Sequence, residues 1–452
     1  MEALIVISVI SIVVFLAVRA NRKDKNDREI PDVKPPVVVE PIPDPEIPPV
    51  VVEPKHKIYD IDIKDDGTDQ TNYIREQLSK VENGTNELRN IIQFPKGRYW
   101  TEGDMENNPR GRNGVFKIVG LENVDIIGNE TIFYTKAPAV PYGSSVSNNS
   151  HSQRRHFWFR ECKNLNVTKI RVEGSNTIDG RSIGTTPELT PEFWKGGKDD
   201  GSISGSPAYK SYWEAEHAFD FRDCTNCGVD NVEVFGVWGD GVYAGADISQ
   251  SKNIYVKNSH FKFTGRQGFA AANNVDGLLI ENNWFDLGRR ASIDFEPHNK
   301  HGYVRNAIVR NNKLHAVQVP IAALGNGDVS NIQILDNEFS GGSFIIAGDS
   351  NKIVPHDRHD WIIRGNKRTN WFGSPMASSS FFHTRNIIFE NNTEQVSSKQ
   401  SRNSIIFDRC KGENIVRNND FSGGRYIQLR DTESVIVEGN IPKQELIQLN
   451  YI

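Results

Sequence analysis

A short phrase of alternating apolar and polar residues, closed by one or two asparagines, recurs eight times between Asn253 and the C-terminus. Clear copies are 279–283, 308–312 and 415–419. From Asn283 onward the closing asparagines are 29, 25, 29, 26, 27 and 21 residues apart. The alternation has the two-residue period of a strand, and a repeat of this length is typical of a solenoid. Each repeat is therefore expected to form one coil of short strands and turns, stacked on the next.

A second strand is expected ahead of each asparagine phrase, and its alignment decides which side chains share a face. Residues 219–221, 242–244, 269–271 and 293–295 align as successive rungs. Because side chains alternate along a strand, the middle residue of each triplet faces outward and its two apolar neighbours face inward. The outward column consists of Asp220, Tyr243, Ala270 and Asp294. Rungs lie about 4.8 Å apart, so the first and last members of this column are about 14 Å apart.

The N-terminus carries a candidate membrane segment. Residues 3–18 are apolar apart from two serines, and only Glu2 precedes them as a charged residue. A signal peptide usually begins with positive charge, so residues 1–20 favour an uncleaved single-pass anchor over a signal segment cleaved after 18–20. The basic residues that follow would keep the large domain in the cytoplasm by the positive-inside rule, and the side of the membrane stays open.

Residues 21–57 form a linker that is first charged and then rich in Pro and Val. The segment 35–41 is repeated as 48–54, each reading Pro-Pro-Val-Val-Val-Glu-Pro. Such a sequence favours the polyproline conformation, which would extend the 24 residues from 31 to 54 over about 70 Å. The linker would then space the domain at 58–452 away from a membrane; a disordered tether is the alternative.

The start of the domain at 58–452 predicts a cap. A turn at 65–69 precedes a helix whose apolar positions include Tyr73, Ile74 and Leu78, and the strand-turn sequence 94–99 follows. A solenoid needs such a cap, because the unpaired strands at an open end would pair with other chains and cause aggregation. This opening resembles the N-terminus of the pectate-lyase-like right-handed parallel β-helix superfamily, over about 58–450. The resemblance implies an all-β, single-stranded parallel β-helix of about 10 coils, and no particular substrate.

The register brings titratable residues to one outer face. Asp220, Asp240, Arg266, Asp294, Glu296 and His298 are predicted to form one outward patch. A nearby arginine and histidine can shift the pKa values of carboxyl groups apart, so that one serves as an acid and another as a base. The sequences 266–268 and 293–297 also resemble a paired motif of bacterial and phage β-helix proteins, an Arg-Gln-Gly rung followed one coil later by Ile-Asp-x-Glu-Pro. The resemblance implies a special role for Arg266, Asp294 and Glu296.

Further side chains are expected to contact a substrate. Arg289 and Arg290 fall at the same corner as Arg266, and Tyr243 lies in the outward column. Long insertions near 135–157 and 174–216 would form walls, and the second carries Trp194 and Trp213, which could stack on sugar faces or anchor the loop.

Other classes of site receive less support. The pair Cys224 and Cys227 lacks a second pair of metal ligands, so buried free thiols are expected. The net charge is -5 and acidic and basic residues are interspersed, so the sequence does not predict a basic surface for nucleic acid. The closing asparagines are interpreted as a structural ladder of side-chain amides. The Gly-His-Gly and Arg-Ile-Lys motifs of polygalacturonases and the motifs of calcium-dependent pectate lyases are missing.

These observations predict a membrane-tethered carbohydrate-active enzyme that binds a polysaccharide in a groove on the β-helix. Hydrolysis is slightly favoured because carboxylates outnumber cations, with Asp294 or Glu296 as the acid and Asp240 or Asp220 as the base or nucleophile. In a lyase or epimerase, Arg266 would instead neutralise a uronate. No cofactor is expected, apart from calcium in the lyase case. The rival class is a non-catalytic polysaccharide-binding adhesin or virion-associated spike. The sequence does not indicate an oligomeric state.

Overall fold

The computed structural model describes eleven stretches of the chain: 56–103, 112–136, 153–174, 216–288, 290–316, 319–341, 343–348, 358–371, 377–395, 403–422 and 426–449. The expected anchor, the linker up to residue 55, Arg289, Trp194 and Trp213 lie outside these residues. Within them, no helix has the length and apolar character needed to span a membrane.

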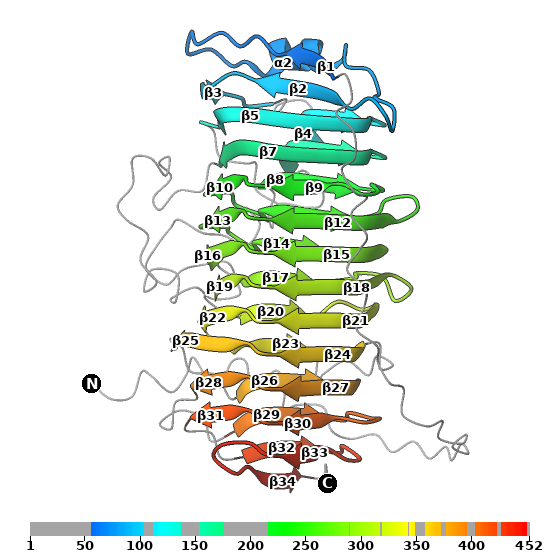
Figure 1. The fold of residues 1–452 in the computed structure, drawn as a ribbon, viewed down its shortest axis with the longest axis vertical. Coiled ribbons are helices and arrows are strands. Elements are labelled where there is room, and N and C mark those ends of the chain that lie inside the picture. The colour runs from blue at the N-terminus through cyan, green and yellow to red at the C-terminus, as the bar shows by residue number, and fades with distance from the viewer. Residues whose placement is uncertain are drawn as a thin grey trace, which may run out of the picture.

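The chain winds into a parallel β-helix whose coils stack along the long axis of the molecule (Figure 1). Most coils contribute one strand to each of three parallel sheets. Sheet 1 contains β1 (Lys57–Asp60), β2 (Asn90–Phe94), β5 (Glu122–Tyr134), β7 (Lys163–Glu173), β9 (Gly228–Asp230), β12 (Ser251–Lys257), β15 (Val275–Glu281), β18 (Tyr303–Arg310), β21 (Asp328–Leu335), β24 (Arg358–Arg364), β27 (Thr384–Glu390), β30 (Ile415–Arg417) and β33 (Ile436–Glu438).

Sheet 2 contains β4 (Arg112–Val119), β6 (Gln153–Arg160), β8 (Glu216–Arg222), β11 (Val242–Gly245), β14 (Phe269–Ala271), β17 (Ala291–Phe295), β20 (Val319–Ala323), β23 (Ile345–Ala347), β26 (Ala377–Phe382), β29 (Asn403–Asp408), β32 (Tyr426–Arg430) and β34 (Glu445–Leu449). Sheet 3 contains β3 (Gly97–Trp100), β10 (Glu233–Phe235), β13 (His260–Lys262), β16 (Trp284–Gly288), β19 (Lys313–Ala316), β22 (Glu338–Gly341), β25 (Lys367–Trp371), β28 (Thr393–Gln395) and β31 (Asp420–Ser422).

The long strands β5 and β7 pair in both sheet 1 and sheet 3, which makes these two sheets one continuous 22-stranded surface, whereas sheet 2 has 12 strands. The parallel β-helix is therefore confirmed. Most coils have three strands, one more than the two that the sequence predicts. The additional strands are those of sheet 3. Many of them, such as β10 and β13, have only three residues, too few for a two-residue period to be recognised.

The N-terminal capping helix is also confirmed. Helix α2 (Thr71–Leu78) lies over the first coil at the end where β1 and β2 lie (Figure 1). Its Ile74 is fully buried and belongs to the interior cluster. Arg75 donates to the backbone carbonyls of Gly114 and Val115 across 2.9 and 2.7 Å. The helix thus covers apolar side chains that would otherwise end at an open edge.

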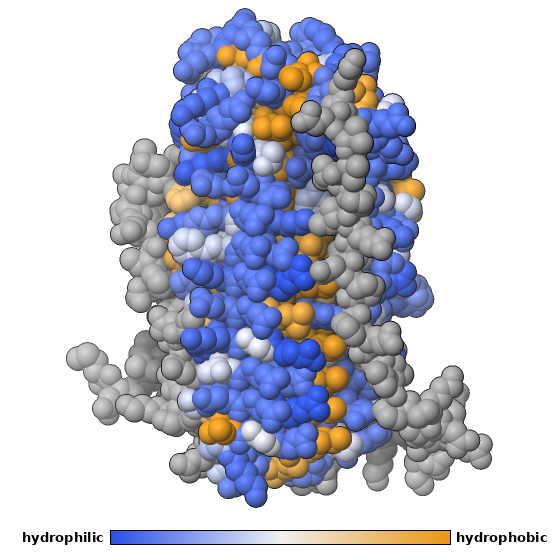
Figure 2. Space-filling model, viewed as in Figure 1, coloured by the Kyte–Doolittle hydropathy of each residue, from blue (hydrophilic) through white to orange (hydrophobic). Residues whose placement is uncertain are grey.

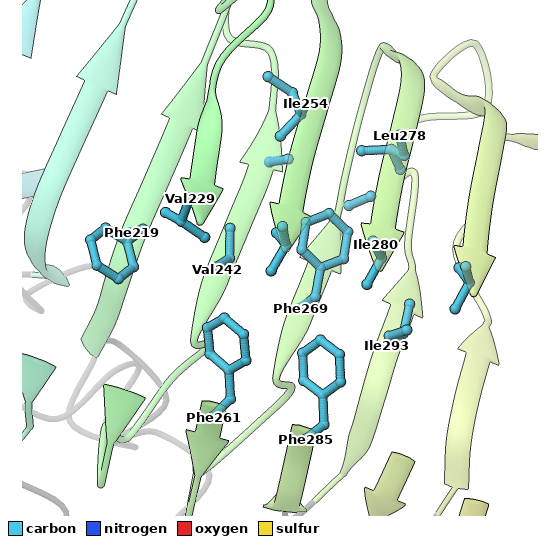
Figure 3. Close-up of a cluster of buried hydrophobic side chains, with 14 of the residues drawn as sticks. Phe219, Val229, Val242, Ile254, Phe261, Phe269, Leu278, Ile280, Phe285 and Ile293 are labelled. Atoms are coloured by element: carbon cyan, nitrogen blue, oxygen red, sulfur yellow. The ribbon is translucent and has the colours of Figure 1, made fainter. Parts of the chain in front are cut away.

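The interior is a continuous stack of apolar side chains from successive coils (Figure 3). Phe219, Val242, Phe269 and Ile293 occupy one inward column of sheet 2, in the register that the sequence predicts. In sheet 3 the rings of Phe261 and Phe285 stack with centroids 5.0 Å apart and planes at 12°. Each fully buried Phe of this kind contributes roughly 1.5–3 kcal/mol.

The closing asparagines form the predicted ladder at the turn between sheets 1 and 3. Asn337 Nδ2, for example, donates to Val309 O across 3.0 Å and to Asn366 Oδ1 across 2.9 Å. A second ladder was not predicted. It links Asn123, Asn164, Asn226 and Asn253 through side-chain amides 2.9 Å apart. All four have a positive φ of 50–56°, a conformation that Asn tolerates better than most residues.

The four cysteines Cys162, Cys224, Cys227 and Cys410 are buried free thiols, as predicted. Among the residues that the structure describes, no group of three or more His, Cys, Asp or Glu side chains is arranged to hold a metal ion.

Candidate functional site

The outward column of sheet 2 has the register that alternation predicts. Strand pairing aligns Asp220 with Tyr243, Tyr243 with Ala270, and Ala270 with Asp294. Tyr243 and Ala270 pack with Ala272 in a small cluster outside the interior core. Although these side chains face outward, Asp220 and Asp294 are only 0 and 5% exposed. Alternation predicts which face a residue occupies, and it does not predict this degree of burial.

Arg266 joins two of the predicted carboxylates. Its Nη1 lies 3.4 Å from Asp240 Oδ2, and its Nη2 lies 3.2 Å from Glu296 Oε2. Asp240 precedes β11, Arg266 precedes β14 and Glu296 follows β17, so three successive coils meet at this guanidinium. Burial also strengthens the pairing, because the side chain of Asp240 is fully buried and that of Arg266 is only 15% exposed.

Gln267 connects Asp240 to the third carboxyl group of the site. Its backbone N–H donates to Asp240 Oδ1 across 3.1 Å, and its side-chain Nε2 donates to Asp294 Oδ2 across 2.9 Å. The geometry therefore brings Asp240, Arg266, Asp294 and Glu296 into one hydrogen-bonded network. We call these four residues, together with Gln267, the acid cluster.

Asp294 is a carboxyl group of the acid cluster whose pKa is raised. Burial and then the negative charge of Glu296 raise its pKa to about 7, against the opposing effects of Arg266 and the Gln267 hydrogen bond. Its Oδ1 is buried and has no hydrogen-bond partner among the described residues. A carboxyl group whose pKa lies near neutral pH has the acidity that general acid catalysis requires.

Asp240 has the opposite protonation preference. Burial favours its neutral form, but Arg266, His217 and the Gln267 N–H outweigh burial and hold the pKa of Asp240 below its usual value. His217 Nδ1 lies 3.2 Å from Asp240 Oδ2. Burial lowers the pKa of His217, so the imidazole is neutral at pH 7. The acid cluster thus pairs an ionised carboxylate with a carboxyl group that is protonated up to neutral pH.

Asp220 lies apart from this network, in a buried ion pair. It accepts hydrogen bonds from Arg155 and Arg222, and these guanidinium groups lower its pKa although burial raises it. The Arg222 guanidinium also lies 4.1 Å from the ring centroid of Tyr243. Asp220 is therefore engaged by two arginines and lies outside the acid cluster.

The remaining predicted site residues are more peripheral. His298 is exposed, and its Nε2 lies 3.5 Å from Tyr243 Oη. Arg290 is one coil beyond Arg266, and its backbone N–H donates to Arg266 O across 3.0 Å. Arg289, Trp194 and Trp213 lie outside the described residues.

The sequence pattern does not single out four residues of this region: Arg155, His217, Arg222 and Gln267. The sequence could have identified Gln267, because it is the middle residue of the sequence 266–268 that carries the family resemblance. The pattern gives no signal for Arg155 and His217, because Arg155 lies within the insertion near 135–157 and His217 directly follows the insertion near 174–216, where the repeat spacing is lost.

Comparisons with solved structures support the fold. The surface adhesin PfbA of Streptococcus pneumoniae matches with a TM-score of 0.53 and 13% identity, over 86% of this chain and 90% of that chain. A double mutant of the tailspike protein of E. coli bacteriophage HK620, in complex with a pentasaccharide, matches with a TM-score of 0.52 and 13% identity. That match covers 84% of this chain and 63% of the tailspike.

An exopolygalacturonase from Thermotoga maritima matches with a TM-score of 0.48 and 13% identity, over 86% of this chain and 94% of that chain. No family model matches the chain, and no curated protein matches it. The right-handed parallel β-helix that the N-terminal motif implies is confirmed, and identities this low show the fold alone.

Proposed function

We propose that the protein is a carbohydrate-active enzyme that hydrolyses a polysaccharide at the outer face of sheet 2, with Asp294 as general acid and Asp240 as general base. The observation that supports this proposal is the difference between the two carboxyl groups. The pKa of Asp294 is raised to about 7 and that of Asp240 is lowered, although one residue, Gln267, binds both. Glycoside hydrolysis requires such a division of roles.

The position of Gln267 favours inversion of the anomeric centre. Its backbone N–H binds Asp240 and its side chain binds Asp294, so the two carboxyl groups are linked through Gln267. Inverting enzymes keep their carboxyl groups about 6.5–9.5 Å apart so that a water molecule fits beside the sugar, whereas retaining enzymes use about 5–5.5 Å. In this arrangement Asp240 would activate the water and Asp294 would protonate the leaving oxygen.

The contacts of Arg266 favour hydrolysis over β-elimination or epimerisation. A lyase needs a cation to neutralise the uronate carboxylate of its substrate. Arg266 is the predicted candidate, and it is already paired with Asp240 and Glu296. Glu296 holds Arg266 in place and raises the pKa of Asp294, so its proposed role is to position and tune the acid.

The rival function is binding without catalysis. It is favoured by one observation, the match to a surface adhesin of the same fold. An adhesin would use the same face to hold a sugar, and it would have no need of two carboxyl groups with divided protonation.

The test is an activity screen of the full chain in detergent against neutral and acidic polysaccharides, with reducing ends and the anomer of the product measured. Asp294→Asn should lower kcat at least about 100-fold, as expected for loss of a general acid. Asp276→Asn, on sheet 1, is the matched control and should keep full activity. Binding of a polysaccharide without cleavage would refute hydrolysis and leave the adhesin function.

The proposed location is a membrane surface, reached through residues 1–20. The support is the apolar run at 3–18 and the absence of a basic residue before it. Fractionation of cells that express the full chain should place it in the membrane pellet after carbonate washing, and the intact N-terminus should be found by mass spectrometry. A soluble chain that begins after residue 20 would identify a cleaved signal segment instead.

A further inference from the structure

Arg358 occupies an inward position of sheet 1 that three preceding coils fill with valine. It is the first residue of β24, in one column with Val275, Val304 and Val329. These valines belong to the interior cluster, behind an outer face of sheets 1 and 3 that is mostly hydrophilic (Figure 2). Arg358 is only 4% exposed. Burying a guanidinium costs free energy unless it is hydrogen-bonded, so its contacts indicate what this arginine provides.

The Arg358 guanidinium binds the main chain that follows β20, one coil earlier. Its Nε donates to Ala323 O across 3.0 Å, and its Nη2 donates to Gly325 O. Gly325 belongs to the segment 324–327, which joins β20 to β21 and which we call the clamp turn. A guanidinium presents its donors in a rigid plane, so two such bonds fix both the position and the orientation of the clamp turn.

The clamp turn lies directly against the peptide bond that follows Glu296. A methyl group on Gly325 would lie 2.6 Å from both N and O of Pro297 and 2.7 Å from the carbonyl carbon of Glu296. The backbone N–H groups of Asn326 and Gly327 also donate to Pro297 O, across 2.7 and 3.0 Å. The clamp turn therefore holds the main chain at Glu296 from the side of the following coil.

Glu296 depends on its main chain for its place in the acid cluster. Its backbone N–H donates to Ala271 O of the preceding coil across 2.7 Å. Its side chain is 28% exposed, and among the described residues Arg266 alone binds the carboxylate. A partly exposed side chain with one such contact is not held by its own packing. Its position therefore follows that of the Glu296–Pro297 peptide.

We propose that Arg358 is a positioning residue of the acid cluster. It fixes the clamp turn against the Glu296–Pro297 peptide, and so keeps the Glu296 carboxylate beside Arg266 and Asp294. The three linked segments belong to consecutive coils, those of β17, β20 and β24 (Figure 1). The inference rests on the proposed function for its effect on catalysis, whereas its effect on Asp294 can be measured without a substrate.

Removal of the guanidinium should lower the pKa of Asp294. The charged groups that act on this carboxyl group are Glu296, Arg266 and Asp240, and the apolar Ala322 faces it from the next coil. Burial, the largest effect on this pKa, stays in place. When Glu296 moves away, its repulsion weakens and Arg266 loses a competing carboxylate. Both changes favour the ionised form of Asp294.

The sign of the change separates positioning from a direct effect of charge. Loss of a positive charge acts directly on a carboxyl group by disfavouring its ionised form, which raises its pKa. Positioning through Glu296 has the opposite sign, because Glu296 raises the pKa of Asp294. A lower pKa after removal of Arg358 therefore cannot come from the lost charge itself.

Carbon-13 NMR of the full chain in detergent, labelled at the aspartate carboxyl carbons, measures this pKa. In Arg358→Met, which suits the valine column, the titration midpoint of Asp294 should fall by at least about 0.5 pH unit, since a neighbouring charge shifts a carboxyl pKa by about 1–3 pH units. Asn337→Ala removes two buried hydrogen bonds at another turn, and is the matched control for lost stability. It should leave the midpoint unchanged. An unchanged or raised midpoint in Arg358→Met would overturn the proposal.

A double variant tests whether Arg358 acts through Glu296. Glu296→Gln removes the charge that Arg358 is proposed to position. In this background Arg358→Met should cause no further change in the midpoint of Asp294, because both substitutions act by one route. A further fall as large as in the wild-type background would show that Arg358 acts by another route, and would contradict the proposal.

Gly325→Ala tests the clamp turn while the arginine stays in place, and it serves equally if Arg358→Met does not fold. The added methyl group separates the clamp turn from the Glu296–Pro297 peptide. The midpoint of Asp294 should again fall. A folded Gly325→Ala protein with the wild-type midpoint would refute the role of the clamp turn.

Kinetics distinguish a failure of this inference from a failure of the proposed function. In an active hydrolase, Arg358→Met should move the alkaline limb of the kcat profile to lower pH with little change in KM. A protein that binds sugars without cleaving them should still show the lower midpoint by NMR, which refutes hydrolysis and supports the positioning role. An active hydrolase with an unchanged midpoint in Arg358→Met refutes the positioning role alone.

Discussion

Gln267 donates a hydrogen bond from its side-chain Nε2 to Asp294 Oδ2 across 2.9 Å. The same residue donates from its backbone N–H to Asp240 Oδ1, so one glutamine holds the two carboxyl groups of the acid cluster in fixed relation. Its bond to Asp294 stabilises the ionised form, whereas burial and Glu296 favour the protonated form. The pKa of Asp294 results from these opposing effects, and each can be removed separately.

Replacing Gln267 with Leu should raise the pKa of Asp294 above about 7. The substitution removes the donor that stabilises the carboxylate and leaves burial in place. If the enzyme proposal holds, the alkaline limb of the pH–rate profile moves to higher pH. An unchanged or lower pKa would show that Gln267 does not bind Asp294 in solution.

Glu296→Gln should shift the pKa of Asp294 in the opposite direction. Glu296 raises this pKa by charge repulsion, and glutamine keeps the size of the side chain without the charge. We expect the alkaline limb to move to lower pH, with kcat reduced less than in Asp294→Asn. Loss of activity as complete as in Asp294→Asn, at every pH, would instead make Glu296 the acid.

The asparagine ladder should contribute measurably to stability. Asn337→Ala removes two side-chain donor contacts, to Val309 O and Asn366 Oδ1, and the acceptor used by the Asn312 N–H and Nδ2. Leaving such buried groups unpaired costs about 1–3 kcal/mol. Denaturant unfolding measures the loss, with the exposed Asn299→Ala as the control that should change stability by less than about 0.5 kcal/mol. A loss no larger than in the control would remove the ladder as a stabilising element.

His359 should make stability depend on pH. Its hydrogen bonds to Asp328 and then Asp360 raise its pKa to about 9. A histidine whose folded-state pKa is raised stabilises the fold fully below the unfolded pKa of about 6.5, and this stabilisation is lost as the pH rises to about 9. For a half-buried site we expect a gain on the order of 1 kcal/mol over His359→Gln. Unfolding of both proteins at pH 6 and pH 9.5 measures this difference, which should nearly vanish at the higher pH.

Two ionisable residues in the core should be replaceable by apolar residues. Arg368 and Glu394 occupy inward positions of sheet 3, between Phe339 and Phe421. Burial lowers the pKa of Arg368 to about 10 and raises that of Glu394 to about 7. Glu394→Leu alone removes the carboxyl group one rung from the buried Arg368 guanidinium, and should lower the stability. The double variant Arg368→Met/Glu394→Leu should be neutral or up to about 4 kcal/mol more stable, and a double variant weaker than both single variants would contradict this expectation.

The sequence predicted the register of sheet 2, because alternation and the regular asparagines together leave one alignment of 219–221, 242–244, 269–271 and 293–295. That register was sufficient to bring Asp240, Arg266, Asp294 and Glu296 to one site. The burial of Asp220 was not predictable, because its partner Arg155 comes from a coil separated from it by the insertion near 174–216. Arg368 and Glu394 could not be predicted either, since alternation assigns apolar residues to their inward positions.

The central measurement is the pKa of Asp294 itself, determined without any substrate. Carbon-13 NMR of the full chain labelled at the aspartate carboxyl carbons, with Asp294→Asn to assign the signal, would follow its titration. We expect a carboxyl group that titrates near pH 7. A signal for Asp294 that titrates near or below pH 4 would show an ordinary carboxylate and contradict its role as the general acid.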